Sequence, residues 1–199
     1  MVNAYTEWSK NGKYDEDLNP TRYRGPVIAT QALAEYFEKS ERSSIRILDV
    51  AAGSGLLGQE LAKFGFTNID ALDPSEGMLD EAVKRNVYTK FICQYFDNNS
   101  DIPCDSYDVL IISGGMGEGH IPGNSIEKMQ EIVKEGGLVV IVMRKEYLTY
   151  VEDYKDLIPR MKQMEEDNKW KILSCKTVEG YSFNKQGLVF ILKVLQSKC

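Results

Sequence analysis

The sequence predicts an α/β fold, in which helices cover both faces of an open and mostly parallel sheet. Three observations carry this prediction. Short apolar, β-branched runs alternate with segments of helical spacing from residue 45 to residue 143. The run Y107-D-V-L-I-I-S113 is nearly all apolar, as expected for a strand buried on both faces. The chain closes with two strand-like runs joined by a short turn, which predicts an antiparallel hairpin.

The individual elements follow from the same periodicities. We expect strands at 45–51, 67–72, 89–95, 107–113 and 138–143, and helices at 27–37, 56–64, 75–86 and 124–134. Pro26 suits the start of the first helix, and Ser75 can cap the third. The segment 145–168 is helical in pattern, and Pro159 is expected to break it into two pieces. The closing hairpin takes 170–183 and 187–195.

Length and composition predict one domain over residues 1–199. A net charge of −6 argues against nucleic acid as a partner. No apolar run approaches the roughly 18 residues that span a bilayer, and the N-terminus lacks a signal-peptide pattern. We therefore expect a cytoplasmic protein that does not associate with a membrane. The expected assembly is a monomer or a homodimer.

The cysteines and the single histidine indicate no metal site. None of Cys93, Cys104, Cys175 and Cys199 forms a C-x-x-C pair. Scattered thiols of this kind are typical of a reducing compartment. Cys93 and Cys175 lie in strand-like runs and are expected to be core residues.

The segment I45-R-I-L-D-V-A-A-G-S-G-L-L-G58 and its continuation to Asp73 carry the strongest functional signal. Gly53, Gly55 and Gly58 form a G-x-G-x-x-G turn that follows a strand and opens a helix. Asp73 ends the next strand, at the spacing of an acid that binds a ribose. The layout predicts a site for a nucleotide-like cofactor at the carboxyl ends of the strands.

Asp49 bears on which cofactor is bound. A carboxylate just before the glycines would repel the pyrophosphate of NAD, which must approach the helix N-terminus. S-adenosylmethionine has a cationic amino-acid end and no phosphate, so Asp49 favours it. A small NAD-dependent oxidoreductase remains the alternative, disfavoured by Asp49 and by the closing hairpin.

Three motifs resemble the successive motifs of class I S-adenosylmethionine-dependent methyltransferases: L48-D-V-A-A-G-S-G-L, A71-L-D-P-S-E-G-M-L79 and Y107-D-V-L-I-I-S113. Further short motifs, G-L-L-G-Q-E-L61, E118-G-H-I-P122, Y14-D and Y23-R-G-P26, resemble the methyltransferase-like proteins of the Williams–Beuren region type. The resemblance implies a Rossmann-like fold with a seven-stranded sheet whose C-terminal strand is reversed. It also implies a lid element at 1–40, a cofactor-binding core at 45–143, and substrate-side helices and the hairpin at 144–199.

The resemblance and the residue types together predict the cofactor site. Asp73 would accept hydrogen bonds from both ribose hydroxyls, and Met78 would pack on adenine. Arg24 would pair with the cofactor carboxylate, as the resemblance implies. Tyr95 and Phe96 would sandwich adenine, or else Asp97 and backbone groups would read it. The full predicted set is Tyr14, Arg24, Asp49, Ala51, Gly53, Ser54, Gly55, Asp73, Pro74, Ser75, Met78, Tyr95, Phe96 and Ser113.

The acceptor side is expected at S113-G-G-M-G-E-G-H-I-P122. The Asn/Asp-Pro-Pro-aromatic motif that amino-methyltransferases of nucleobases share is absent there, which argues against nucleobase methylation. Glu118 and His120 are predicted as an acid–imidazole pair that takes a proton from the acceptor, or else they only order the loop. Contacts to the acceptor are predicted for Trp8, Met116, Arg144 and Tyr147.

We therefore expect methyl transfer from S-adenosylmethionine to a nucleophilic O, N or S atom of a small molecule, with S-adenosylhomocysteine as product. The alternative is a catalytically weak regulatory protein that binds the same cofactor. The sequence does not identify the acceptor.

Overall fold

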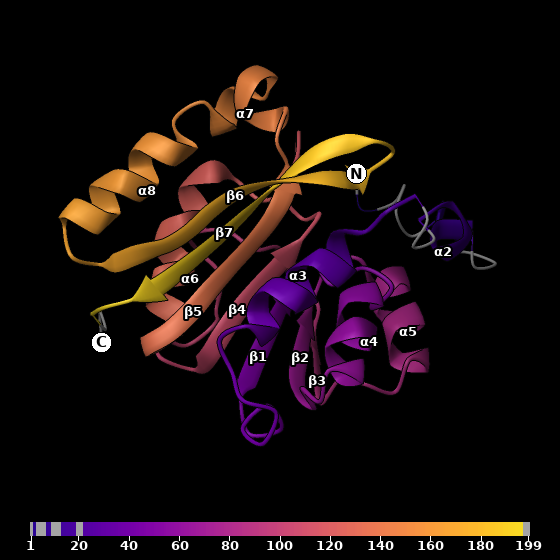
Figure 1. Ribbon diagram of the computed structural model, residues 1–199. Helices are drawn as coiled ribbons and strands as arrows, with labels where there is room; N and C mark the ends of the chain where they lie inside the picture. The colour runs from indigo at the N-terminus through magenta and orange to yellow at the C-terminus, as the bar shows by residue number, and fades with distance from the viewer. Residues whose placement is uncertain (1, 3–6, 9–12, 19–21, 197–199) are drawn as a thin grey trace.

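The computed structural model describes residues 2, 7–8, 13–18 and 22–196. Its strands are β1 (Arg46–Val50), β2 (Asn68–Leu72), β3 (Lys90–Ile92), β4 (Tyr107–Ser113), β5 (Val133–Arg144), β6 (Trp170–Ser182) and β7 (Lys185–Val194). They form one seven-stranded sheet in the order β3-β2-β1-β4-β5-β7-β6 (Figure 1). Strand β7 is antiparallel to both neighbours, and the pairs from β3 to β5 are parallel. The predicted mostly parallel sheet with a reversed last strand is confirmed.

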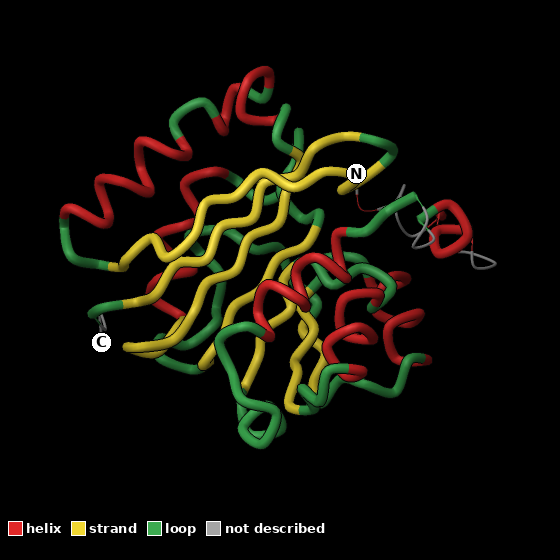
Figure 2. Tube along the Cα trace, in the orientation of Figure 1, coloured by secondary structure: helices red, strands yellow, loops and turns green. Residues whose placement is uncertain are grey.

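Helices lie on both faces of this sheet (Figures 1 and 2). The helix α3 (Gly25–Ala34) packs on one face, together with α4 (Leu56–Lys63) and α5 (Glu76–Lys84). The opposite face carries α6 (Ile126–Ile132) and α8 (Leu157–Glu166). Shorter pieces are α2 (Lys13–Asp17), α7 (Tyr147–Tyr150) and the 3-10 turns η2 (Gly123–Ser125) and η3 (Glu152–Tyr154). Within the predicted lid at 1–40, α3 packs on the sheet, whereas Trp8, Tyr14, Leu18 and Tyr23 lie at the carboxyl edge.

The two helical layers bury alternate residues of the central strands. In β4, Leu110 and Ile112 join the core under α6 and α8, whereas Val109 and Ile111 join the core under α3 and α4. All four side chains have no exposed surface. Successive side chains of a strand point to opposite faces, so a run without polar residues is what a sheet covered on both sides requires.

Local signals in the sequence place several element ends. Pro26 lies in the first turn of α3, and the Ser75 hydroxyl accepts the Met78 backbone N–H at the start of α5. Strand β3 spans only Lys90–Ile92, shorter than predicted. Pro159 does not break a helix, because it lies in the first turn of α8, where its missing N–H costs no helical hydrogen bond. The breaks fall instead on either side of η3.

Two expectations about the cysteines are wrong. Cys93, just after the edge strand β3, and Cys175, in the edge strand β6, are both exposed rather than part of the core. Cys104 is disulfide-bonded, so the thiols are not a uniformly reduced set. In the described part of the chain, no helix is long and apolar enough to cross a membrane.

The strand order reverses at β1, whose neighbours β2 and β4 lead to opposite edges of the sheet. In open α/β sheets, ligands bind in the crevice outside the carboxyl ends of the strands at such a reversal. The loops that follow β1, β2, β4 and β5 all lie at this edge, together with the N-terminal segment and the β6–β7 turn (Figure 1).

Candidate functional site

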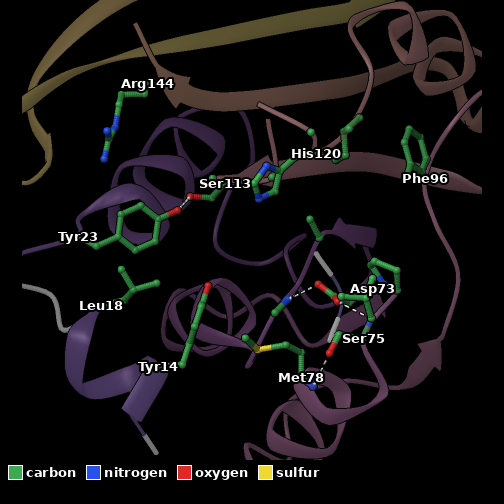
Figure 3. A pocket seen from close by; sticks show the side chains of 18 of the residues that line it. Tyr14, Leu18, Tyr23, Asp73, Ser75, Met78, Phe96, Ser113, His120 and Arg144 are labelled. Atoms are coloured by element: carbon green, nitrogen blue, oxygen red, sulfur yellow. Dashed lines mark hydrogen bonds between the residues drawn. The ribbon is translucent and has the colours of Figure 1, made fainter. Parts of the chain in front are cut away.

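A cavity of about 580 Å³ lies at the carboxyl edge of the sheet. Its size falls within the roughly 300–1,000 Å³ of typical small-molecule sites. Figure 3 shows labelled residues from distant parts of the chain around this space. The predicted site residues that line it are Trp8, Tyr14, Ala51, Gly53, Asp73, Pro74, Ser75, Met78, Tyr95, Phe96, Ser113, His120, Arg144 and Tyr147.

Asp73 is the buried carboxylate of this cavity and is 8% exposed. One of its oxygens accepts the Gly53 backbone N–H at 2.9 Å, and the other accepts the Ser75 N–H at 2.9 Å. Burial raises the pKa of Asp73, while these two N–H groups and the nearby His120 oppose the rise. Each carboxylate oxygen has a second lone pair, so Asp73 can also accept a pair of ligand hydroxyls.

An apolar recess continues from Asp73. Met78 is 1% exposed and Phe96 is 5% exposed, and both line the cavity. Tyr95 is 67% exposed and lies at the cavity mouth. Asp97 also lines the cavity, so both predicted ways of holding a base, between rings or through an acid, have their residues in place. A flat apolar group can be buried here next to the hydroxyl-binding carboxylate.

Asp49 lies behind the glycine turn and does not line the cavity. Its side chain is 1% exposed, and the Tyr88 hydroxyl donates to its Oδ2 at 2.7 Å. The Tyr88 oxygen in turn accepts the Gly58 backbone N–H at 3.1 Å. A Cβ at position 58 would overlap the Tyr88 ring, so the ring can pack here only because residue 58 is glycine. Burial raises the pKa of Asp49 to about 7, and the Tyr88 hydrogen bond opposes that rise.

The turn supported by Asp49 has an unusual backbone. Ala51 has φ of 58° and Gly53 has φ of 56°, both in the left-handed region. Glycine adopts this region freely, whereas for alanine it costs about 1–2 kcal/mol. Ser54 and Gly55 lie behind the turn, away from the cavity lining, and Gly55 is the N-cap of α4. Of the predicted turn residues, Ala51 and Gly53 therefore line the cavity itself.

The N-terminal segment covers the turn from the other side. A Cβ built on Gly53 would lie 3.4 Å from the Tyr14 hydroxyl oxygen. The Tyr23 hydroxyl lies 3.0 Å from Ser113 Oγ at the end of β4. Arg24 does not line this cavity. Its side chain lies at a separate groove between α3 and the β6–β7 sheet, away from the predicted position near the cofactor carboxylate.

The glycine-rich loop after β4 is shaped by a residue far along the chain. The buried Tyr154 hydroxyl donates toward the Gly117 and Ile121 carbonyls and accepts the Gly117 N–H at 2.8 Å. Met116 has no exposed surface and packs in the core, so it does not contact the cavity as predicted.

His120 faces the cavity, but its predicted partner does not. Its Nδ1 lies 2.9 Å from the backbone carbonyl oxygen of Glu118, and the Glu118 carboxylate is not among the cavity-lining groups. A carbonyl only accepts, so Nδ1 of the neutral ring carries the proton and Nε2 carries the acceptor lone pair. The structure therefore brings the imidazole to the cavity, and the contact of the imidazole with Glu118 is to the backbone carbonyl rather than to the predicted carboxylate.

Sequence reasoning missed the turn between β6 and β7. Tyr181, Ser182 and Phe183 line the cavity, and Leu18 and Tyr23 face them from the N-terminal segment. The two segments are joined by the Tyr23–Ser182 bridge and by the Phe183 N–H, which donates to the Arg22 carbonyl at 2.8 Å. No motif indicates this pairing, because the two segments lie at opposite ends of the sequence.

Comparison with known proteins agrees with this geometry. A family model for a methyltransferase domain matches residues 47–137. Methyltransferase-like protein 27 of Homo sapiens is 31% identical over 165 residues, covering 81% of this chain and 66% of that protein. The ubiquinone biosynthesis O-methyltransferase of Shewanella halifaxensis is 27% identical over 156 residues, covering 75% of this chain and 62% of that protein. This chain thus spans about two thirds or less of the length of these relatives.

Solved structures show the same fold. A chain from the Haloferax volcanii complex between a methyltransferase activator and a methyltransferase superposes with a TM-score of 0.71 at 14% identity, covering 96% of this chain and 98% of that one. An S-adenosylmethionine-dependent methyltransferase of Aquifex aeolicus gives a TM-score of 0.59 at 14% identity, with 96% and 98% covered.

The chain belongs to the class I S-adenosylmethionine-dependent methyltransferases. Within them, the predicted resemblance to the methyltransferase-like proteins is supported by the match to Methyltransferase-like protein 27. The cofactor of this family is S-adenosylmethionine, which sets aside the NAD-dependent oxidoreductase alternative. The cavity fits such a cofactor, because a buried carboxylate with lone pairs for ribose hydroxyls lies beside an apolar recess for a base.

Proposed function

We propose that this protein transfers the methyl group of S-adenosylmethionine to a nucleophilic O, N or S atom of a small-molecule acceptor. One observation carries the proposal. A single cavity begins at Asp73 and the glycine turn and continues, past Ser113 and His120, to a pocket covered by the N-terminal segment and the β6–β7 turn. A ligand bound at the first end therefore lies in the same cavity as a second, smaller ligand bound at the other end.

The proposed roles follow the cavity from one end to the other. Asp73 binds the ribose hydroxyls, while Met78 and Phe96 bury the base. In the transfer, the acceptor nucleophile bonds to the methyl carbon as the carbon–sulfur bond breaks and its electron pair stays on sulfur, which yields S-adenosylhomocysteine. His120 takes the acceptor proton on Nε2. Enclosure by the loops excludes water and aligns the reactants, which can itself supply much of the rate.

Enclosure and charge favour a small acceptor over a macromolecule. Tyr23 and Phe183 line the acceptor end of a cavity whose volume, about 580 Å³, is that of a small-molecule site. The net charge of −6 opposes binding to a polyanion. A small molecule can enter this space whole, whereas a folded nucleic acid would need the covering segments to part.

The test is isothermal titration calorimetry with S-adenosylmethionine, S-adenosylhomocysteine and NAD. We expect both sulfur compounds to bind and NAD not to bind. Asp73→Ala should weaken binding of S-adenosylmethionine by about 1–3 kcal/mol, or roughly 5- to 150-fold, because charge-assisted hydrogen bonds are lost. Asp80→Ala, on the exposed surface of α5, is the matched control and should bind normally. An unchanged dissociation constant in Asp73→Ala would remove this residue from the site.

The alternative function is a regulatory protein that binds the cofactor without turnover. It is favoured by the contact of His120 with the backbone carbonyl of Glu118 instead of the predicted carboxylate. An acceptor screen that monitors release of S-adenosylhomocysteine separates the two functions. Binding without product in that screen would favour the regulatory protein.

A further inference from the structure

The two ends of the cavity differ in charge. Asp73 and Asp97 lie at the end formed by β2 and β3, whereas Arg144 ends β5 on the other side. Of the described residues lining the cavity, Arg144 is the one with a permanent positive charge. Strands lie about 4.8 Å apart, so the three steps from β2 through β1 and β4 to β5 span roughly 14 Å. Arg144 therefore lies beyond the cofactor end, on the acceptor side.

The guanidinium of Arg144 is only partly neutralised. Its Nη1 lies 3.3 Å from Glu146 Oε1, and its Nη2 lies 3.4 Å from Ser182 Oγ, both at the long end for hydrogen bonds. The other Glu146 oxygen accepts from Lys185 Nζ at 3.0 Å. Two cations thus share one carboxylate, which leaves this cluster with a net positive charge. A planar guanidinium in this state can bind a carboxylate through two parallel hydrogen bonds.

Aromatic rings surround this guanidinium. Arg144 lies over the Tyr147 ring, 5.5 Å from its centre. Tyr23 and Tyr181, whose rings meet edge to face with centres 5.6 Å apart, line the same part of the cavity. Rings arranged in this way favour a flat ligand, because aromatic pairs adopt stacked or edge-to-face contacts. The surroundings of Arg144 therefore suit an anionic group attached to a ring.

Phe183 supplies an independent observation. It has φ of 47°, followed by Asn184 with φ of 62°, at the tip of the β6–β7 turn. Glycine, asparagine and aspartate are favoured at such positions, and a bulky residue there is strained. The Phe183 side chain is 51% exposed, so burial within the protein does not offset this strain. Strained residues of this kind cluster at ligand sites, and Phe183 lines the cavity mouth.

We propose that the acceptor is an aromatic carboxylate, whose carboxylate is bound by Arg144 and whose ring is covered by Phe183. This inference rests on the proposed function and names the class of its second substrate. Arg144 and Phe183 act in it as residues that determine specificity.

The experiment measures equilibrium binding of matched probes to the protein saturated with S-adenosylhomocysteine. The probes are hydroxybenzoates and hydroxycinnamates, each paired with its primary amide. Wild-type protein should bind at least one carboxylate more than tenfold more tightly than its amide. Arg144→Gln should bring this ratio within about twofold, since the buried anion loses its partner. The matched control Lys145→Gln, whose side chain is directed at Gln186, should keep the ratio.

Phe183→Asn separates a ligand-binding role from a structural one. It should raise the midpoint of thermal unfolding, because asparagine tolerates the left-handed backbone, and at the same time weaken carboxylate probes at least fivefold. A variant that keeps full probe affinity would overturn the role of Phe183.

Two further outcomes decide the proposal. If Arg144→Gln weakens S-adenosylmethionine more than tenfold, the arginine binds the carboxylate of the cofactor, and the inference is wrong. If wild-type protein binds S-adenosylmethionine but prefers no carboxylate probe over its amide, the inference fails while the proposed function stands. If S-adenosylmethionine does not bind at all, both fail.

Discussion

Two buried aspartates, one within β2 and one just after it, have opposite surroundings. Asp70, within β2, accepts hydrogen bonds from Tyr107 at 2.8 Å, from Thr89 at 2.6 Å and from Arg46 at 3.1 Å. Asp73, just after the same strand, accepts the backbone N–H groups of Gly53 and Ser75 and faces the cavity. The first carboxylate has three side-chain donors, including a cation, and the second keeps lone pairs directed at open space.

The difference teaches how to tell a structural carboxylate from a ligand-binding one. Arg46 pairs with Asp70 and also lies over the Tyr107 ring, 4.6 Å from its centre, so this cluster ties β1, β2 and β4 together. Among the described residues, Asp73 forms no salt bridge with an arginine or lysine, its charged neighbour is His120, and burial raises its pKa. Burying a carboxylate with so few donors costs free energy in the ligand-free protein, and hydroxyl groups donated by a bound ligand reduce that cost.

Asp70→Ala should give the largest effect on folding. It removes the acceptor for the Tyr107 and Thr89 hydroxyls and the counter-charge of Arg46, so the free energy of unfolding should fall by about 2–4 kcal/mol. Urea denaturation measures this change, and calorimetry should show unchanged affinity for S-adenosylmethionine. Asp73→Ala should give the reverse pattern, with weaker binding and a smaller loss of stability. Equal losses of stability in the two variants would show that the comparison is wrong.

Asp49, on β1 between these two regions, should make stability depend on pH. Its pKa is about 7 in the folded protein, above the roughly 3.9 of an unfolded chain. The folded state therefore binds more protons between these values, and stability should fall as pH rises from about 4 to 7, by up to about 1.4 kcal/mol per pH unit. The raised pKa of Asp73 acts in the same direction.

Asp49→Asn should reduce that slope, because an amide does not titrate and its oxygen still accepts from Tyr88. Urea unfolding of the variant and the wild type at several pH values across this window measures the difference. An identical slope in both proteins would mean that Asp49 keeps an ordinary pKa.

The smallest effect is expected in the turn next to Asp73. Ala51 has φ of 58°, so Ala51→Gly should raise the free energy of unfolding by about 0.5–1 kcal/mol as the left-handed strain is relieved. Thermal unfolding measures this gain. Ala52→Gly, in the neighbouring position that does not have positive φ, is the control and should lower stability. A loss of stability in Ala51→Gly would mean that the packing of the Ala51 methyl group outweighs the strain.

Much of the cofactor end could be predicted from the sequence because its residues lie close together along the chain. Asp73, Ser75 and Met78 follow one strand and begin one helix, and all three line the cavity. The acceptor end could not be predicted in the same way. Phe183 reaches the acceptor end of the cavity through a hairpin tip. Behind the glycine turn, Tyr88 reaches Asp49 from a loop beyond α5, which the sequence did not predict either.

The sequence by itself determined the α/β class, the reversed last strand and the glycine turn with its acid. These features depend on periodicity and on backbone chemistry within a few residues. Only the tertiary structure decided that Asp49 lies behind the turn, that Arg24 faces another groove, and that Arg144 meets the β6–β7 turn. The physical reason is that burial and charge pairing depend on neighbours in space, which the folded sheet brings together from distant parts of the chain.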